Sequence, residues 1–217
     1  MSTRTVSTWD ISVGPRNLPG ILAIPAASRG LVIFAHGSGS SRLSPRNAHA
    51  ARRLQAVNIA TLLFDLLTEA ESADRRNVFD IPLLASRVVD AISWARSDQR
   101  TKSHAVGLFG ASTGAGAALL AASQRPNDVA AVVSRGGRPD LAGEALPSVR
   151  APTLLIVGGN DRDVLALNHA AAARMTCEKS VMVIPGAGHL FEEPGTLELA
   201  LTAAGAWFLK YIPGGHT

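Results

Sequence analysis

The run Gly110-Ala111-Ser112-Thr113-Gly114 has the G-x-S-x-G pattern of a serine that lies on a tight turn between a strand and a helix. An apolar stretch precedes this run, and small residues that suit a closely packed helix follow it. The positions two before and two after the serine must lack bulk in such a turn, and Gly110 and Gly114 meet that need. At the expected helix N-terminus, Ser112 is surrounded by free N–H groups that favour developing negative charge. The pattern indicates a nucleophile, although a turn that only lets a helix pack on a sheet has the same composition.

A serine hydroxyl is a weak nucleophile, so it needs a base to take its proton and a third group to orient that base. Asp161 follows the apolar stretch 153–157, and His189 follows the apolar stretch 180–184 in a glycine-rich loop. The chain order Ser, Asp, His, with each residue just beyond a strand, is that of a catalytic triad. The sequence predicts Ser112 as the nucleophile, His189 as the general base and Asp161 as the residue that orients the base.

Two aspartates compete for the third position. Asp161 lies midway between Gly158 and Val164, whereas Asp163 lies nearer the start of the following helix and is a candidate N-cap. We therefore expect Asp161 to orient the histidine. His36 precedes the serine in the chain, and we expect it to brace its own loop.

An acyl-transfer intermediate also needs two N–H donors that point at its negative oxygen. The residue directly after the nucleophile, Thr113, is expected to supply one of them. The loop 36–41, which reads HGSGSS, follows another apolar stretch and is expected to supply the second. We assign that donor to Ser38, with Gly39 as the alternative.

Two arginines are candidates for substrate binding. Arg42 lies in the same loop as Ser38, and Arg135 lies just past the end of a predicted strand. Either guanidinium has the fork geometry that holds a carboxylate. An ordinary surface role is the alternative, because arginine is the dominant cation throughout this chain.

These candidates need a sheet that brings the ends of several strands together. The first two apolar stretches, Val6–Val13 and Gly20–Ile24, are separated by a turn too short for a parallel crossover, so we expect them to form an antiparallel pair at one edge of the sheet. The other stretches leave room for helices between them, which predicts an α/β fold with a mostly parallel sheet of about eight strands and helices on both faces. The predicted strands are Val6–Val13, Gly20–Ile24, Leu31–Ala35, Ile59–Phe64, Ala105–Phe109, Val129–Val133, Thr153–Val157 and Ser180–Ile184.

Helical spacing and capping residues place the main helices. Ser44-Pro45 opens a helix expected to run to about Val57. Apolar residues at helical spacing predict a second helix through 81–95, on which Arg87 is expected to face water, and a last one through 197–211. The stretch 136–152 is expected to be a long loop with at most one short helix, so no lid domain is expected.

Composition limits the classes of protein to be considered. With 217 residues, 47% of them hydrophobic and 18% charged, the chain fits a single domain over 1–217. The net charge of +4 is scattered, and aromatic residues make up 5%, so we expect no nucleic-acid partner. The opening ten residues lack the apolar core of a signal peptide, and no membrane-spanning stretch is found, which predicts a cytoplasmic protein without a membrane partner. A lone Cys177 offers no internal disulfide and no metal-ligand cluster.

The HGSGSS loop, the GASTG turn, the GGND loop and the GAGH loop together resemble the α/β-hydrolase superfamily over nearly the whole chain. The small size and the lack of a lid resemble its dienelactone hydrolase-like branch, in which the nucleophile is a cysteine. Ser112 stands at that position here.

The chemistry predicted is that of a serine hydrolase that cleaves a small ester, thioester or lactone through an acyl-enzyme, with no metal or organic cofactor. The expected partner is a small ester-like substrate, and the chain is expected to be a monomer or a homodimer. Two alternatives stay open: a non-catalytic member that keeps the fold as a binding module, and an acyltransferase or cofactor-free peroxidase that uses the same triad.

Overall fold

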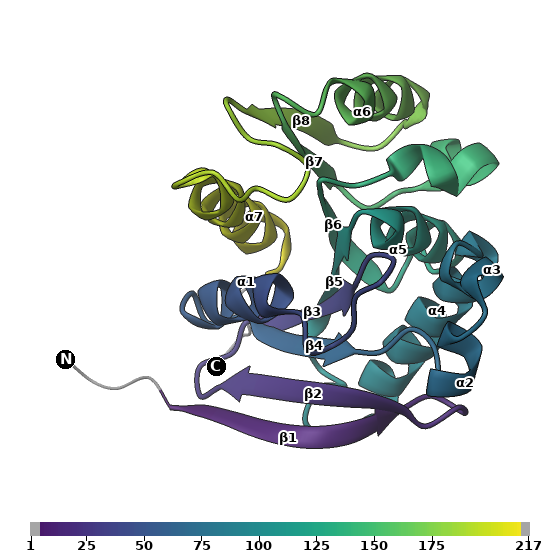
Figure 1. Cartoon of the computed structure of the whole chain (residues 1–217). Coiled ribbons are helices and arrows are strands. Elements are labelled where there is room, and N and C mark those ends of the chain that lie inside the picture. Colours follow the sequence, from purple (N-terminus) through teal and green to yellow (C-terminus); the bar gives the residue numbers. More distant parts are fainter. Residues whose placement is uncertain (1–4, 214–217) are drawn as a thin grey trace.

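An eight-stranded sheet in the order β1-β2-β4-β3-β5-β6-β7-β8 forms the centre of the computed structural model, which describes residues 5–213 (Figure 1). β1 runs antiparallel to β2, β2 runs antiparallel to β4, and every other neighbouring pair is parallel. The mostly parallel sheet and its antiparallel edge pair are therefore confirmed. The ends of the predicted domain, 1–4 and 214–217, lie outside the described residues. The strands are β1 (Val6–Val13), β2 (Leu18–Pro25), β3 (Gly30–Ala35), β4 (Ala60–Phe64), β5 (Ala105–Ala111), β6 (Val129–Arg135), β7 (Thr153–Gly158) and β8 (Lys179–Ile184).

Helices cover both faces of this sheet, as predicted (Figure 1). α1 and α7 pack on one face, and α4, α5 and α6 pack on the other, each set closing its own apolar core. β3, β4 and β7 are buried along their whole length, which is typical of parallel strands covered on both sides. The helices are α1 (Pro45–Gln55), α2 (Glu69–Ser72), α3 (Arg75–Val78), α4 (Ile81–Ser97), α5 (Thr113–Gln124), the 3₁₀ segment η1 (Pro139–Ser148), α6 (Arg162–Arg174) and α7 (Thr196–Tyr211).

Arg87 on α4 was expected to face water, and this prediction is wrong. The side chain is buried and forms an ion pair of 2.8 Å with Glu71. Glu71 belongs to α2, a single-turn helix in the connection after β4 that apolar periodicity did not reveal, because four residues are too few to show a helical repeat. The partner that makes burial of Arg87 possible was therefore invisible in the sequence pattern.

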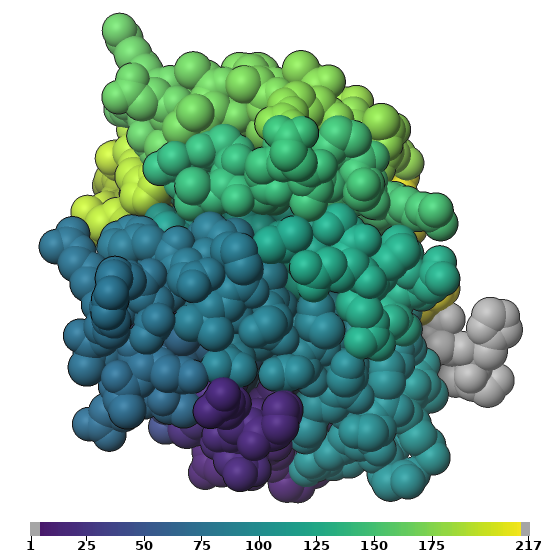
Figure 2. Space-filling model, turned by 90° about the vertical axis from the view of Figure 1, so that its right-hand side faces the viewer, coloured from purple at the N-terminus to yellow at the C-terminus, as the bar shows by residue number. Residues whose placement is uncertain are grey.

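The turn between β1 and β2 packs on helix α4, which ties the antiparallel edge to the rest of the fold. A side chain added at Gly14 in this turn would approach the Cβ of Asp90 to 2.9 Å. In the view onto this face the purple tip of the hairpin lies between the blue and teal helical segments (Figure 2). None of the helices within residues 5–213 is long and apolar enough to cross a bilayer.

Candidate active site

Ser112 occupies a sharp turn between β5 and α5. Its backbone has φ 50° and ψ −125°, a conformation that costs a residue other than glycine about 1–3 kcal/mol. The turn is tight because α5 packs directly against the loop after β3: a Cβ on Gly114 would lie 2.2 Å from the carbonyl oxygen of Ala35. A Cβ on Gly110 would lie 2.4 Å from the Cα of Ala115. The two glycines of the motif are thus required by contacts, as the G-x-S-x-G pattern predicts.

Asp161 and His189 form a hydrogen-bonded pair. The Nδ1–H of His189 donates to Oδ2 of Asp161 at 2.7 Å, and because a carboxylate only accepts, the other ring nitrogen, Nε2, is left as the acceptor of the imidazole. Asp161 is the N-cap residue of α6, yet its side chain makes no capping hydrogen bond. Asp163, expected as the possible N-cap, lies inside the first turn of that helix instead.

Backbone contacts hold the loops of Asp161 and His189 against each other. Asn160 donates from its backbone N–H to the carbonyl of Ala187 at 2.9 Å and from its side chain to the carbonyl of Gly186 at 2.8 Å. Gly158 at the end of β7 approaches so closely that a Cβ there would lie 2.4 Å from the carbonyl oxygen of Ala187. The distance between carboxylate and imidazole is therefore set by two loops that are bonded to each other.

Ser112 and His189 line the same cavity, whose volume is about 250 Å³. The serine hydroxyl makes no capping hydrogen bond to α5, and no hydrogen bond joins it to His189 among residues 5–213. Catalytic hydrogen bonds are often loose without substrate and tighten when it binds. The arrangement presents an uncommitted hydroxyl and an oriented imidazole to one cavity.

The structure brings Ser38 and Thr113 together, but through a bond that the sequence did not indicate. The backbone N–H of Ser38 donates to the hydroxyl oxygen of Thr113 at 2.9 Å. The loop makes a turn closed by the Ser40 N–H on the Gly37 carbonyl at 3.2 Å, with Gly39 at φ 67°. The amide chosen for the oxyanion is thus already bonded, and a substrate oxygen would have to share it with the Thr113 hydroxyl.

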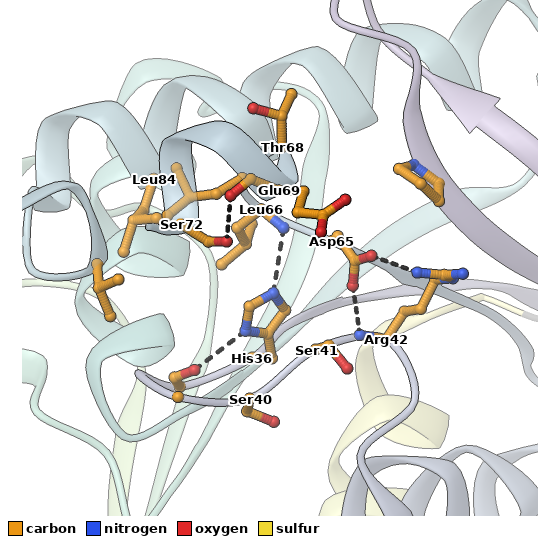
Figure 3. A pocket seen from close by; sticks show the side chains of 15 residues that line it. His36, Ser40, Ser41, Arg42, Asp65, Leu66, Thr68, Glu69, Ser72 and Leu84 are labelled. Atoms are coloured by element: carbon orange, nitrogen blue, oxygen red, sulfur yellow. Dashed lines mark hydrogen bonds and ion pairs between the residues drawn. The ribbon is translucent and has the colours of Figure 1, made fainter. Parts of the chain in front are cut away.

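Arg42 does not line the cavity that holds Ser112 and His189. Its backbone N–H and its guanidinium both bond the carboxylate of Asp65, as Figure 3 shows. It lines an adjoining cavity of about 520 Å³. The predicted substrate-binding role is therefore not supported by the geometry, because an arginine already neutralised by a carboxylate has little left to offer a second one.

His36 also lines this adjoining cavity and fills a structural role (Figure 3). Its Nε2 accepts a hydrogen bond of 3.1 Å from the Leu66 N–H, so Nδ1 carries the proton and donates to the Gly37 carbonyl at 3.0 Å. Burial lowers the pKa of His36, which favours this neutral form. These hydrogen bonds agree with the expectation from chain order that His36 braces its own loop.

A family model described as an alpha/beta hydrolase domain matches residues 28–204, a span that contains Ser112, Asp161 and His189. This chain belongs to the α/β-hydrolase family. A crystal structure of a dienelactone hydrolase from Anabaena variabilis is 52% identical, with a TM-score of 0.93, and the match covers 97% of this chain and 100% of that one. The dienelactone hydrolase-like resemblance is confirmed by this match.

Other relatives of this α/β-hydrolase differ in length and description. Two Mycobacterium tuberculosis proteins with the provisional name phosphoribosyl transferase are 55% identical over 204 residues, which is 94% of this chain and 46% of each relative. The chain therefore spans about half the length of these curated relatives. A Xanthomonas campestris α/β serine hydrolase without a lid has a TM-score of 0.77 at 20% identity, covers 100% of this chain with 99% of its own, and shares the fold.

Arg135 lines the cavity of Ser112 and His189 in this α/β-hydrolase, as its position at the end of β6 suggested. Two residues that sequence reasoning missed line it too, Arg46 and Asn47, both in the first turn of α1. Their signal was available: the predicted helix began at Ser44-Pro45, directly after the loop expected to face the substrate.

Proposed function

We propose that this α/β-hydrolase is a serine hydrolase that cleaves a small ester, thioester or lactone through an acyl-enzyme. The observation that carries the proposal is the 2.7 Å hydrogen bond between His189 and Asp161. This bond fixes the orientation of an imidazole that lines the same cavity as Ser112. The strained backbone of Ser112 supports it, since such strain persists where the surrounding structure enforces it.

In the proposed reaction, Nε2 of His189 takes the proton of Ser112 as Oγ attacks the substrate carbonyl carbon. The oxygen that becomes negative is stabilised by the N–H groups of Thr113 and Ser38, the latter shared with the Thr113 hydroxyl. His189 then returns the proton to the leaving alkoxide or thiolate, and the acyl-enzyme remains. Water deprotonated by His189 attacks that ester, and Ser112 leaves with the proton as the carboxylic acid is released. Asp161 stabilises the imidazolium at both stages.

The 52% identical structure from Anabaena variabilis, described as a dienelactone hydrolase, supports hydrolysis of an ester or lactone. For the relatives named as phosphoribosyl transferases, we propose that phosphoribosyl transfer belongs to the half of their length that this chain does not match. The cytoplasmic location, the absence of nucleic-acid and membrane partners and the monomeric or dimeric state stay predictions.

A screen of short acyl esters, thioesters and lactones with wild type and Ser112→Ala tests the proposal. We expect hydrolysis of at least one class by the wild type and a loss of about 10⁴-fold or more in the variant. Acid release that survives in Ser112→Ala, or a folded wild-type protein that cleaves none of the three classes, would contradict it.

A further inference from the structure

Arg135 is a buried cation without a partner. Its side chain ends β6 with 7% of the residue exposed, and its Nε and Nη1 are enclosed without a hydrogen-bond acceptor among residues 5–213. Its guanidinium carbon lies 5.9 Å from the centre of the Phe109 ring, which stabilises the charge only in part. A buried charge normally has a counter-ion, because taking it out of water costs several kcal/mol.

The side chains that line the cavity beside Arg135 include a second cation. Arg46, which forms an exposed ion pair of 3.5 Å with Glu192, lines this cavity. Ser44 and Asn47 line it too, at the N-terminus of α1, an 11-residue helix whose dipole is positive at that end. Within the described range, residues 5–213, the cavity is lined by no carboxylate. Burial, and secondly the charge of Arg46, lower the pKa of Arg135 to about 10, so the guanidinium keeps its charge at neutral pH.

Resting on the serine hydrolase function, we propose that the substrate carries a compact anionic group, a carboxylate or a phosphate, close to its scissile carbonyl, and that Arg135 binds this group as the specificity-determining residue. Ser112 and His189 line the same cavity of about 250 Å³, so a ligand that reaches the guanidinium lies within a few bonds of the nucleophile. The anion is the counter-ion that Arg135 lacks among the described residues. Arg46 and the N-terminus of α1 add long-range attraction for it.

The first test compares monomethyl succinate, which is an anion, with dimethyl succinate, its neutral counterpart. We expect the wild type to favour the anion in kcat/KM by at least about tenfold, and Arg135→Met to lose at least about tenfold of that ratio. Arg135→Lys keeps the charge but not the fork, so an intermediate ratio is expected. Arg125→Met is the matched control, because Arg125 pairs with Asp128 at 2.7 Å and is not among the residues that line this cavity; its ratio should follow the wild type.

The second test needs no turnover and separates the two sources of the anion. Ser112→Ala is titrated with sodium succinate or sodium phosphate at constant ionic strength, and the melting temperature Tm is followed. We expect one of the two anions to raise Tm by about 2 °C or more, and the rise to disappear in Ser112→Ala/Arg135→Met. The anion that gives the larger shift identifies the group.

The outcomes distinguish this proposal from the function on which it rests. Ester cleavage that depends on Ser112 but shows the same anion preference in wild type and Arg135→Met overturns the role of Arg135 alone. Equal Tm shifts with and without Arg135 overturn it as well. No cleavage of any ester, with a Tm shift that depends on Arg135, would contradict the hydrolase and leave an anion-binding site.

Discussion

The two adjoining cavities share the loop residues Gly37 and Ser40, yet the polar side chains that line them differ in whether they have bonding partners. In the larger one, His36 has both ring nitrogens bonded and Arg42 is paired with Asp65. In the smaller one, Nε2 of His189 and the Nε and Nη1 of Arg135 have no hydrogen-bond partner among residues 5–213. Most buried polar groups of a folded chain are hydrogen-bonded, and groups left unbonded in a cavity are candidates for ligand binding or catalysis, so this difference supports our proposal that the smaller cavity is the active site.

Substitution of His189 and of His36 is expected to give the largest difference in kcat/KM. His189→Gln should lower kcat/KM by about 10⁴-fold, because the base is lost while the fold is kept. His36→Gln should change kcat/KM by less than about tenfold and instead lower the free energy of unfolding by about 1–3 kcal/mol, since the partly buried hydrogen bonds to Leu66 and Gly37 are disturbed. Steady-state kinetics and urea denaturation measure the two effects, and similar losses of activity in both variants would erase the distinction.

The next largest difference, in kcat, is expected between variants of Asp161 and Asp163. Asp161→Asn should lower kcat by about 10³–10⁴-fold, because an amide cannot hold the imidazole of His189 in the tautomer that leaves Nε2 free. Asp163→Asn, two residues further along α6, is the matched control and should stay within about threefold of the wild type. A larger effect at Asp163 than at Asp161 would mean that the sequence interpretation chose the wrong acid.

The two arginines should change stability with opposite signs. Arg135→Met should raise the free energy of unfolding by about 1–3 kcal/mol, because it removes a buried charge that has no partner in the described part of the chain. Arg42→Met should lower it by about 1–2 kcal/mol, because the carboxylate of Asp65 loses its counter-ion. Urea melts of both variants at neutral pH measure this, and a loss of stability in Arg135→Met would show that the cation has a partner in the free protein.

The smallest expected effect is the pH dependence of the difference in unfolding free energy between the wild type and Arg135→Met. With the pKa of Arg135 lowered from its ordinary value to about 10, the folded protein binds the proton less tightly than the unfolded chain, which corresponds to a folding cost of about 3 kcal/mol when the group is charged. The cost is fully present below pH 10 and diminishes as pH rises through 10. The stability advantage of Arg135→Met should therefore be constant up to about pH 10 and shrink above it, as chemical melts at several pH values would show. An advantage that stays constant above pH 10 would contradict the lowered pKa.

Local patterns predicted much of this molecule, because strands and tight turns are encoded within a few residues. The eight strands and the turn at Ser112 follow from apolar runs and glycine spacing. The pairing of Arg42 with Asp65, the burial of Arg87 beside Glu71 and the bond from Ser38 to Thr113 were not predicted. Each joins segments far apart in sequence, so it depends on how loops meet in space and not on the residue's own neighbours.

Labelling with a fluorophosphonate probe, followed by intact mass, tests whether Ser112 is an activated nucleophile. We expect one label per wild-type chain, none in Ser112→Ala, and full labelling in Ser123→Ala, a control on α5 whose hydroxyl donates to the Leu120 carbonyl at 2.7 Å. A folded wild-type protein that takes no label, or a label that persists in Ser112→Ala, would show that Ser112 is not the activated nucleophile.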